Sequence, residues 1–258
     1  YIRKALKGFS GDLVISSKSV AVTYRAMEEA IEEARKEMDR DVIEIFLLHE
    51  VRHNGDLQLR RGAWECLLEA RSKGIVKAIG LSTHHVDVAE EAADLPECDV
   101  LFPLINFRSL GIRKGSGLGT KEEMEKAIQK ASEKGLGVFG MKAFGGGNLT
   151  GHYREALDYV YGVPGIHSNM IGFGHRREVD DIFSYLEGQL PGDYNPDIRY
   201  KKINIDQGDC EACYACLKKC PNMAIFINEN GLADIDHEKC LTCGYCAPVC
   251  PVRAIIMF

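Results

Sequence analysis

Eight of the ten cysteines in the chain are concentrated between residues 210 and 250. They form two runs, CEACYACLKKCP at 210–221 and CLTCGYCAPVCP at 240–251, each with the spacing C-x2-C-x2-C-x3-C before a proline. The residues after the runs also correspond, since Ala224-Ile225-Phe226 matches Ala254-Ile255-Ile256. This part of the chain is therefore a duplicated unit.

Cysteines clustered in this way in a long chain without a secretory signal favour metal binding over disulfides. Thiolates two residues apart can surround one corner of an iron–sulfur cubane, whose fourth ligand then comes from elsewhere. A structural zinc site usually takes two ligand pairs separated by a longer loop. Zinc and disulfides are the alternatives, and the spacing favours iron–sulfur clusters.

Over about fifty residues these runs resemble a bacterial two-cluster ferredoxin, in which the fourth cysteine of each run binds the other cluster. The resemblance implies two [4Fe-4S] clusters. The ligands implied for cluster I are Cys210, Cys213, Cys216 and Cys250, and those for cluster II are Cys240, Cys243, Cys246 and Cys220. Two clusters in so small a module favour electron transfer, and stabilisation of a small core is the alternative.

Residues 12–188 alternate short apolar runs with amphipathic stretches. Thr120-x-x-Glu123 is a capping box that predicts a helix ending at Gly135. Strands are predicted at 12–18, 42–49, 76–82, 100–107, 136–144 and 168–174. Apolar strands separated by helices indicate a parallel sheet covered on both faces. A closed barrel of this kind needs eight strands, so six strand–helix units predict an α/β fold with an incomplete (β/α)8 TIM barrel.

Three segments follow from this pattern. We predict a β/α barrel at 1–188 whose first strand–helix units are missing, a linker at 189–208, and a small α+β ferredoxin-like domain at 209–258. The linker is predicted from its richness in Gly, Pro and Asp. Within the ferredoxin-like domain, FINENGLADI predicts a hairpin that turns at Asn230-Gly231.

Composition narrows the classes of partner. Hydrophobic residues make up 45% and charged residues 27% of the chain, and the net charge is −6. We therefore expect neither nucleic acid nor an anionic membrane as a partner, and we find no apolar run of membrane-spanning length. Clusters that oxygen destroys suggest a reducing compartment, so the expected location is cytoplasmic.

The segment 1–188 resembles the iron–sulfur-bearing branch of the aldo-keto reductase superfamily, in five pieces that occur in the same order. These pieces are ALKG…DLVISSKS, DVIEIFLLHE, GIVKAIGLSTH, GVFGMKAFGGG and SNMIGFGHRREVDDI. The resemblance implies an eight-stranded β/α barrel that reduces carbonyl groups with NADPH, or less often NADH. Its substrate would be a small carbonyl compound or the corresponding alcohol.

The resemblance implies that Lys18 and His49 are catalytic. The lysine would lower the pKa of a tyrosine that donates a proton to the carbonyl oxygen, and the histidine would orient the carbonyl group. Ser82 would contact the nicotinamide carboxamide. Taken alone, Lys18 reads as a solvated lysine and His49 as a core histidine. Lys18, His49, Ser82, Lys142 and Gly172 all end predicted strands, and barrels of this kind keep their chemistry at that face.

Further cofactor contacts are expected from backbone amides and arginines. The full set is Ser82, Lys142, Gly145, Gly146, Gly147, Gly172, Gly174, Arg176 and Arg177. A run of glycines lets backbone amides approach a pyrophosphate, although a flexible loop is the commoner explanation. Two arginines at a helix start oppose the helix dipole, which a bound phosphate would offset. A solvated pair is the alternative.

The sequence also departs from the family pattern. The aspartate and tyrosine of the family lie in a "DTA…YG" segment that would precede Tyr1, so we interpret the chain as lacking about 50 residues at its front. A naturally short form is the alternative. Phe102 and Ile182 stand near the positions of the Gln and Asn that contact the cofactor in the family. The segment 107–119, rich in glycine, is expected to be a mobile loop.

Three interpretations differ in how electrons move. Hydride transfer moves two electrons together, whereas a [4Fe-4S] cluster accepts one. The favoured interpretation is an NAD(P)H-dependent carbonyl reductase or alcohol dehydrogenase that carries a ferredoxin domain. The second is an electron-transfer protein linked to a redox protein partner, with a flavin in the barrel. The third is a non-enzymatic iron–sulfur protein with a degenerate barrel.

Overall fold

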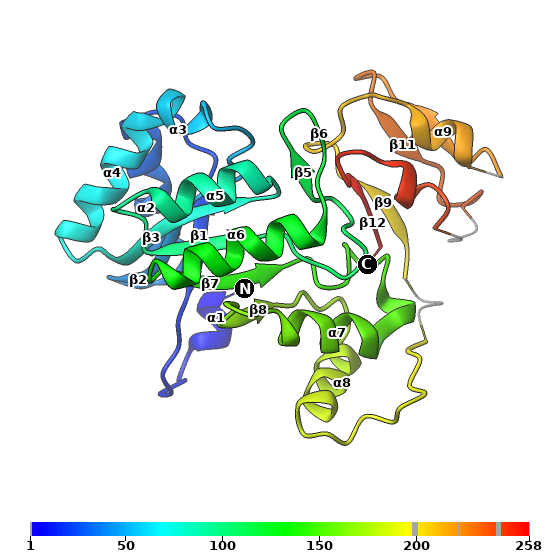
Figure 1. Cartoon of the computed structure of the whole chain (residues 1–258), viewed down its shortest axis with the longest axis horizontal. Coiled ribbons are helices and arrows are strands. Elements are labelled where there is room, and N and C mark those ends of the chain that lie inside the picture. The colour runs from blue at the N-terminus through cyan, green and yellow to red at the C-terminus, as the bar shows by residue number, and fades with distance from the viewer. Residues whose placement is uncertain (1, 198–200, 221, 241–243, 258) are drawn as a thin grey trace. The chain divides into compact units, whose positions relative to one another are not determined.

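The computed structural model describes residues 2–197, 201–220, 222–240 and 244–257 (Figure 1). They fall into two compact units that do not follow the chain order. Unit 1 is made of Tyr1–Pro103, Arg113–Phe139 and Pro164–Ser168, and unit 2 of Leu104–Ile112, Gly140–Val163 and Asn169–Phe258. No described helix combines the length and the apolar character needed to cross a bilayer.

The main sheet has six strands in the order β1-β2-β3-β4-β7-β8. Parallel pairing is seen from β1 through to β7. The strands are β1 Ser16–Ser19, β2 Ile43–Leu48, β3 Val76–Thr83, β4 Val100–Pro103, β7 Gly137–Met141 and β8 Ser168–Met170. All six predicted strands are present, and neighbours in sequence are neighbours in the sheet. The architecture is the predicted incomplete β/α barrel.

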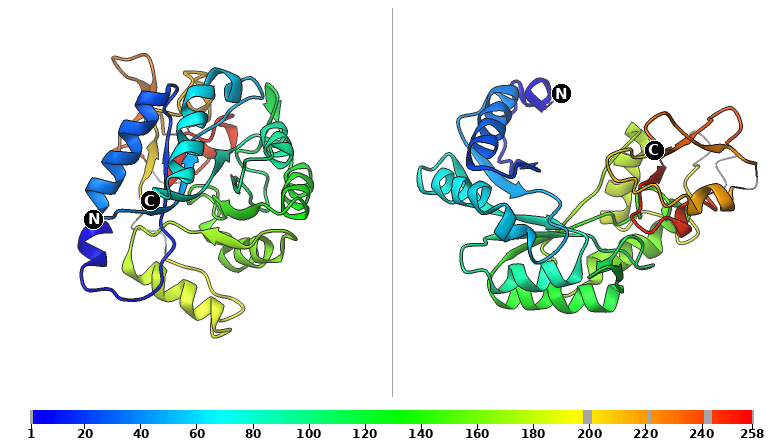
Figure 2. Two further views of the ribbon diagram at one scale, coloured as in Figure 1. Left: turned by 90° about the vertical axis from the view of Figure 1, so that its left-hand side faces the viewer. Right: turned by 90° about the horizontal axis from the view of Figure 1, so that it is seen from above.

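Helices alternate with these strands. They are α1 Ile2–Leu6, α2 Tyr24–Met38, α3 Asp56–Leu59, α4 Arg61–Ser72, α5 Val86–Asp94, α6 Lys121–Glu133, α7 Tyr153–Gly162 and α8 Arg176–Leu186. In unit 1, α2, α4, α5 and α6 lie on the outer side of the curved sheet (Figure 2). The predicted capping box starts α6, because Thr120 Oγ1 accepts a hydrogen bond from the Glu123 amide and Glu123 accepts one from the Thr120 amide. These contacts satisfy amides that the first turn leaves unpaired.

The segment 107–119, expected to be a mobile loop, contains regular structure instead. Arg113–Lys114 (β5) and Gly117–Leu118 (β6) form a two-stranded antiparallel hairpin. The hairpin joins unit 1 through the Arg113 amide, which donates a hydrogen bond of 2.8 Å to the His84 carbonyl. The glycine-rich composition of this segment thus reflects a tight turn, with Gly115 in the left-handed region at φ 52°.

The ferredoxin-like module lies in unit 2. Its elements are β9 Ile203–Ile205, α9 Ala215–Lys219, β10 Ile225–Ile227, β11 Ala233–Ile235, a 3-10 turn at Ala247–Val249 and β12 Ile255–Met257. β10 and β11 form the predicted antiparallel hairpin, and β9 pairs with β12. β9 lies in the segment interpreted as a linker, so part of that segment belongs to the module.

The sequence repeat produces a structural repeat. Met223 and Arg253, which hold equivalent positions, both adopt left-handed backbone at φ 50° and 58°. The residues that follow them, Ala224 and Ala254, are each 1% exposed. The Ala224 carbonyl accepts from the Asp236 amide at 2.8 Å, and the Ala254 carbonyl accepts from the Asp206 amide at 2.7 Å. The two halves of the module therefore have the same local fold.

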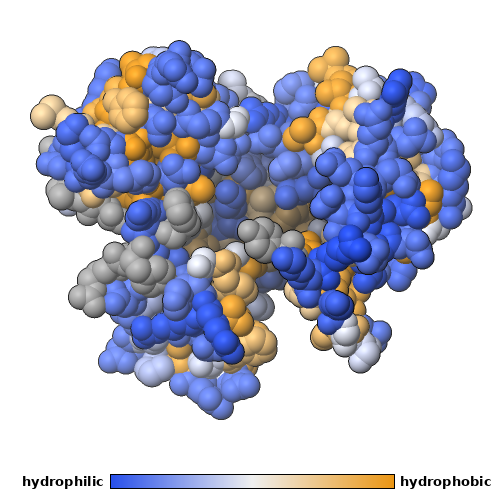
Figure 3. All heavy atoms as spheres, turned by 180° about the vertical axis from the view of Figure 1, so that it is seen from behind, coloured by the Kyte–Doolittle hydropathy of each residue, from blue (hydrophilic) through white to orange (hydrophobic). Residues whose placement is uncertain are grey.

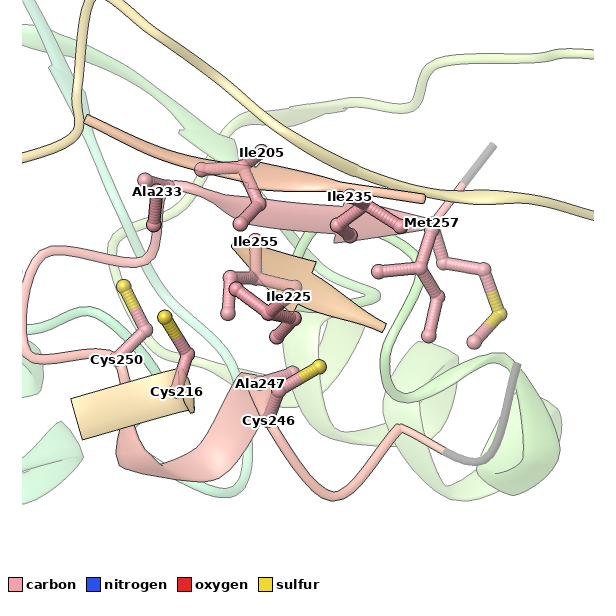
Figure 4. Close-up of a cluster of buried hydrophobic side chains, with 12 residues drawn as sticks. Ile205, Cys216, Ile225, Ala233, Ile235, Cys246, Ala247, Cys250, Ile255 and Met257 are labelled. Atoms are coloured by element: carbon pink, nitrogen blue, oxygen red, sulfur yellow. The ribbon is translucent and has the colours of Figure 1, made fainter. Parts of the chain in front are cut away.

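Apolar side chains fill the interior of the module. Figure 4 shows isoleucines from β9, β10, β11 and β12 packed above the cysteine-bearing turns. By contrast, the face of the molecule drawn in Figure 3 is mostly hydrophilic, with smaller apolar areas. The buried isoleucines and the buried cysteines share one core, so these predicted cluster ligands sit in an apolar environment.

Candidate functional site

Three of the predicted site residues lie on three neighbouring strands of unit 1. Lys18 is in β1, His49 follows β2, and Ser82 is in β3, all at the carboxyl ends; the three strands are labelled in Figure 1. His49 Nδ1 lies 2.7 Å from Ser82 Oγ. Ser82 is buried, His49 is partly buried and Lys18 is exposed. The parallel sheet thus brings together residues that are 31 or more positions apart in the chain.

The Ser82 hydroxyl group fixes the turn that carries His49. Besides contacting the imidazole, Ser82 Oγ accepts a hydrogen bond of 3.0 Å from the Glu50 amide. The Ser82 carbonyl accepts another, of 3.0 Å, from the Val51 amide. Glu50 itself has left-handed backbone at φ 58°. In this structure Ser82 contacts the ring of His49. The sequence had indicated only a contact between Ser82 and the nicotinamide.

Arg60 is a residue of this site that the sequence did not single out. Its side chain is buried and donates hydrogen bonds to the carbonyl groups of Ser19 at 3.1 Å, Ala21 at 3.1 Å and His49 at 2.8 Å. Burial lowers the pKa of the Arg60 guanidinium group. Its planar donors suit several acceptors at once. Arg60 therefore fixes the end of β1, beside Lys18, relative to His49.

The glycine run Gly145–Gly147, predicted to approach a pyrophosphate, contacts the last strand of the ferredoxin-like module within unit 2. The Gly146 carbonyl accepts a hydrogen bond of 2.7 Å from the Met257 amide. Asn148 Nδ2 donates to the Ile255 carbonyl at 3.1 Å. All three glycines have positive φ, as does the preceding Lys142 at φ 63°. The glycines thus have a packing role that needs no cofactor.

Gly147 is the position where this contact depends most on glycine. Its φ is 88°, and a methyl group there would lie 2.1 Å from the Met257 carbonyl oxygen. We expect Gly147→Ala to destabilise unit 2 by about 3 kcal/mol, the sum of left-handed strain and overpacking. The free energy of unfolding is measured by denaturant titration, with circular dichroism as the signal. Gly151→Ala is the control, since nothing lies within 4 Å of a methyl group there; equal stability of both variants would contradict the prediction.

Gly172, Gly174, Arg176 and Arg177 surround the exposed N-terminus of α8. Two amides there are already bonded to Glu178, whose Oε2 accepts from Gly174 at 2.7 Å and from His175 at 3.4 Å. The carboxylate of Glu178 also pairs with the buried Lys201 amine. Because a carboxylate uses these amides, a phosphate at this helix would depend on the arginine side chains.

The described cluster ligands fit an iron–sulfur centre. Cys216, Cys246 and Cys250 are buried in the module core, and Cys210, Cys220 and Cys240 pack against it. Cys243 lies outside the described residues. Among the residues that the structure describes, these cysteines are not joined in disulfides. The Ala224 amide donates to Cys220 Sγ at 3.2 Å, the kind of N–H···S contact that stabilises a ligating thiolate.

Cys216 and Cys250 come from different runs but lie side by side. Figure 4 shows their sulfur atoms pointing the same way, whereas Cys246 points elsewhere. Burial raises the pKa of the Cys216 thiol, and the neighbouring Cys250 and Cys213 raise it further. Three of the four ligands implied for cluster I therefore gather. Among the described residues, no three side chains of the types that bind metals are close enough to hold a single metal ion. The ligands of a cubane are farther apart than those of a single ion, because each binds a different iron atom.

Comparison with known proteins agrees with this arrangement. The profile of the Aldo/keto reductase family matches residues 1–193, and that of the 4Fe-4S dicluster domain matches 202–251. A ferredoxin from Pyrobaculum islandicum is 42% identical over 57 residues, which are 22% of this chain and 53% of the ferredoxin. A component of an ion-translocating oxidoreductase complex from Methanosarcina acetivorans is 50% identical over 46 residues, 18% of this chain and 17% of that protein.

Solved structures show the same fold. A protein from Pseudomonas aeruginosa assigned as an aldo-keto reductase has a TM-score of 0.57 and 19% identity, over 69% of this chain and 65% of its own. An aldo-keto reductase from Bacillus halodurans has a TM-score of 0.56 and 16% identity, over 75% of this chain and 72% of its own. The chain spans about half of the curated ferredoxin and less than two thirds of the Pseudomonas protein. It belongs to the aldo/keto reductase family and carries a 4Fe-4S dicluster ferredoxin domain.

Proposed function

We propose that the protein is an NAD(P)H-dependent oxidoreductase that reduces a small carbonyl compound, or oxidises the corresponding alcohol, and carries two [4Fe-4S] clusters for electron transfer. The observation that supports this most is the grouping of Lys18, His49 and Ser82 at adjacent carboxyl ends of parallel strands. Barrels of this type hold their catalytic residues at that face. Family membership supports the same reaction class.

His49 is proposed to orient the substrate carbonyl group. Nδ1 contacts the Ser82 hydroxyl group, and we assign Nε2 as the ring nitrogen that would face the carbonyl oxygen. Lys18 is exposed on the strand that pairs with β2, and it would place a positive charge near the phenol that the family resemblance implies as the proton donor. A nearby positive charge lowers the pKa of a phenol and makes it a better acid. Bound NAD(P)H supplies the hydride.

Arg60 acts as a positioning residue in this proposal. Its guanidinium group bonds to the carbonyl groups of Ser19 and His49, so the lysine and the histidine are held on one rigid frame. Such precise placement matters because catalytic geometry must be kept within fractions of an ångström. Arg60 contacts no reacting atom, and its contribution is to fix the spacing between β1 and the turn after β2.

The proposed contacts with the phosphate groups of the nucleotide lie in unit 2. Arg176 and Arg177 would bind a phosphate group, which planar guanidinium donors suit well. Lys142 and Gly145–Gly147 would contact the pyrophosphate, and Gly172 and Gly174 would let the nucleotide approach the start of α8 closely. Among these groups the arginines are exposed, so their charge is available to a ligand.

Nicotinamide binding tests the proposal. NADPH fluorescence titration, on the chain together with whatever its gene encodes ahead of Tyr1, should give saturable binding. The double variant R176A/R177A should weaken NADPH at least about tenfold, since two charge-assisted hydrogen bonds are lost, and should change NADH little.

Arg25 and Arg61, exposed arginines of unit 1, provide the control, so R25A/R61A should bind NADPH like the parent. Equal weakening of NADPH and NADH in R176A/R177A would contradict the assignment of a phosphate contact. Absence of saturable binding of either nucleotide would contradict the proposed function.

A second candidate is a ferredoxin-linked electron-transfer protein whose barrel holds a flavin or no cofactor. It is favoured by Phe102, which stands near the family's glutamine position but is buried and stacks on Phe139 with ring centroids 4.2 Å apart. Ile182, near the family's asparagine position, is likewise buried, among Tyr153 and Leu157. A flavin absorbance spectrum in the purified protein, with no binding of NADPH, would support this candidate over the first.

A further inference from the structure

The two halves of the ferredoxin-like module differ in what surrounds them, although their backbones correspond. The residues in and around the two cysteine runs correspond at a spacing of thirty positions in sequence. The equivalent pairs are Lys218 and Pro248, Lys219 and Val249, Met223 and Arg253, Phe226 and Ile256, and Lys239 and Asp209. The repeat therefore provides an internal comparison between the surroundings of the two predicted clusters.

The half that supplies Cys250 to cluster I is covered by loops of unit 2. Arg253 lies against the loop after β4, because a methyl group at Gly111 would be 2.6 Å from Arg253 Cγ. Ile256 approaches the loop after β7, with its Cγ2 3.2 Å from the corresponding position at Gly146. The amide of the buried Met257 donates to the Gly146 carbonyl. Backbone and side chains of β12 are thus both in contact with the barrel loops.

Among the described residues, the equivalent half, which supplies Cys220 to cluster II, leaves large apolar side chains exposed. Met223 is 83% exposed and Phe226 is 46% exposed, although both are large and apolar. Tyr245, next to the cluster II ligand Cys246, is 64% exposed. We define the cluster II surface as Lys218, Lys219, Met223, Phe226 and Tyr245. Exposed apolar side chains that flank the implied ligands of one cluster in sequence favour an interaction site there.

The charge of this surface is basic. Lys218 and Lys219 immediately precede Cys220, are exposed, and form no ion pair among the residues that the structure describes. A third lysine, Lys239, precedes Cys240 and pairs with Asp236 at 2.6 Å. The equivalent positions near cluster I carry Pro248, Val249 and Asp209. In a chain of net charge −6, an unpaired lysine pair beside apolar side chains is a local feature that complements an acidic partner.

We propose that the cluster II surface is the docking surface for an acidic one-electron carrier protein, and that cluster I, under the loops after β4 and β7, is the inner end of the electron path. One electron leaves the reduced carrier, enters cluster II and passes to cluster I, with no bond made or broken. The inference deepens the proposed function, because it rests on the clusters being a conduit for electrons. An apolar centre with a charged rim is typical of transient redox complexes, whose interfaces are small.

Stopped-flow reduction of the protein with both clusters in place tests the docking surface. The probe is a fully reduced acidic flavodoxin, and cluster bleaching is followed at wavelengths where the flavin contributes little. The double variant K218E/K219E should slow the second-order reaction about tenfold at low ionic strength, with a smaller effect in high salt. Reduction by dithionite, which needs no docking, should proceed at the parent rate.

The matched control is K4E/K7E, which makes the same charge change at exposed lysines in and after α1. It should react with flavodoxin at the parent rate. Met223→Ser should also slow the flavodoxin reaction, with little dependence on salt, because it removes apolar contact area. The proposal is wrong if K218E/K219E reacts at the parent rate, if K4E/K7E slows the reaction equally, or if a basic carrier reacts faster than flavodoxin.

These outcomes are separable from those of the proposed function. A protein that shows the charge effect but binds no nicotinamide would keep the docking surface and lose the carbonyl reductase. A protein that binds NADPH through Arg176 and Arg177 but shows no charge effect would keep the carbonyl reductase and lose the docking surface.

Discussion

Replacing Cys250 by alanine should remove about half of the iron and acid-labile sulfide, and the lost half should be cluster I. Cys250 belongs to the second run, yet its sulfur lies beside that of Cys216 from the first run (Figure 4). We expect each cluster to take three cysteines from one run and the fourth cysteine of the other run. Replacing the fourth cysteine of a run should therefore disable the cluster that the other run holds. Iron and sulfide analysis and electron paramagnetic resonance measure the loss.

Double variants show which cysteines share a cluster. C216A/C250A should lose no more iron than C250A alone, because both ligands belong to cluster I. C246A/C250A should lose nearly all of the iron, since each change disables a different cluster. The reverse result, with C216A/C250A empty and C246A/C250A half-loaded, would mean that each run fills its own cluster.

Cys98 provides the control for these substitutions. It is buried in unit 1, burial raises the pKa of its thiol to about 12, and it belongs to neither of the two cysteine runs. Cys98→Ala should retain the full iron content. Loss of iron in that variant would show that cluster content follows general stability rather than ligand identity.

Lys18→Met and His49→Ala should each lower kcat/KM for carbonyl reduction by about 10²–10⁴-fold, the usual contribution of a group that assists proton transfer. The assay uses small aldehydes and ketones with NADPH, on the chain together with whatever its gene encodes ahead of Tyr1. Lys18 lies in β1 beside the strand that leads to His49, so both side chains are presented at one end of the sheet.

The two variants differ in their pH profiles. Removing the Lys18 charge takes away a group that lowers the pKa of the donor phenol, so the phenol keeps its proton to higher pH. The alkaline limb of the pH–rate profile should therefore move to higher pH in Lys18→Met and keep its position in His49→Ala. Lys4→Met, at an exposed position of α1, should have the parent rate. Parent activity in Lys18→Met would remove this lysine from the mechanism.

Much of the fold could be predicted because its signals are local. The apolar run around Ile43–Leu48 is bounded by charged residues, and it became a buried strand. The Thr120 capping box and the turn at Asn230-Gly231 were predicted for the same reason, since each depends on residues a few positions apart. In a parallel sheet, strand order then places Lys18, His49 and Ser82 at one edge without further information.

Contacts between distant segments could not be predicted in this way. Arg60 reads as half of a solvated Arg60-Arg61 pair, yet it is buried against a carbonyl 41 positions away. Asn148 bonds to Ile255 across 107 positions, and nothing in the glycine run beside it indicates that partner. The bonding of Glu178 to Lys201 was missed likewise, because a pattern of residue types specifies local structure but not which surfaces meet.

The three carbonyl bonds of Arg60 have a consequence for motion at the site. A terminal strand residue normally frays on its own, since its opening exposes only its own backbone groups. Here the last residues of β1 and the turn after β2 bond to a single guanidinium group, and releasing either one removes part of the hydrogen bonding of a buried positive charge. Opening of one segment therefore weakens a contact of the other, and Arg60 couples local unfolding at the lysine to local unfolding at the histidine.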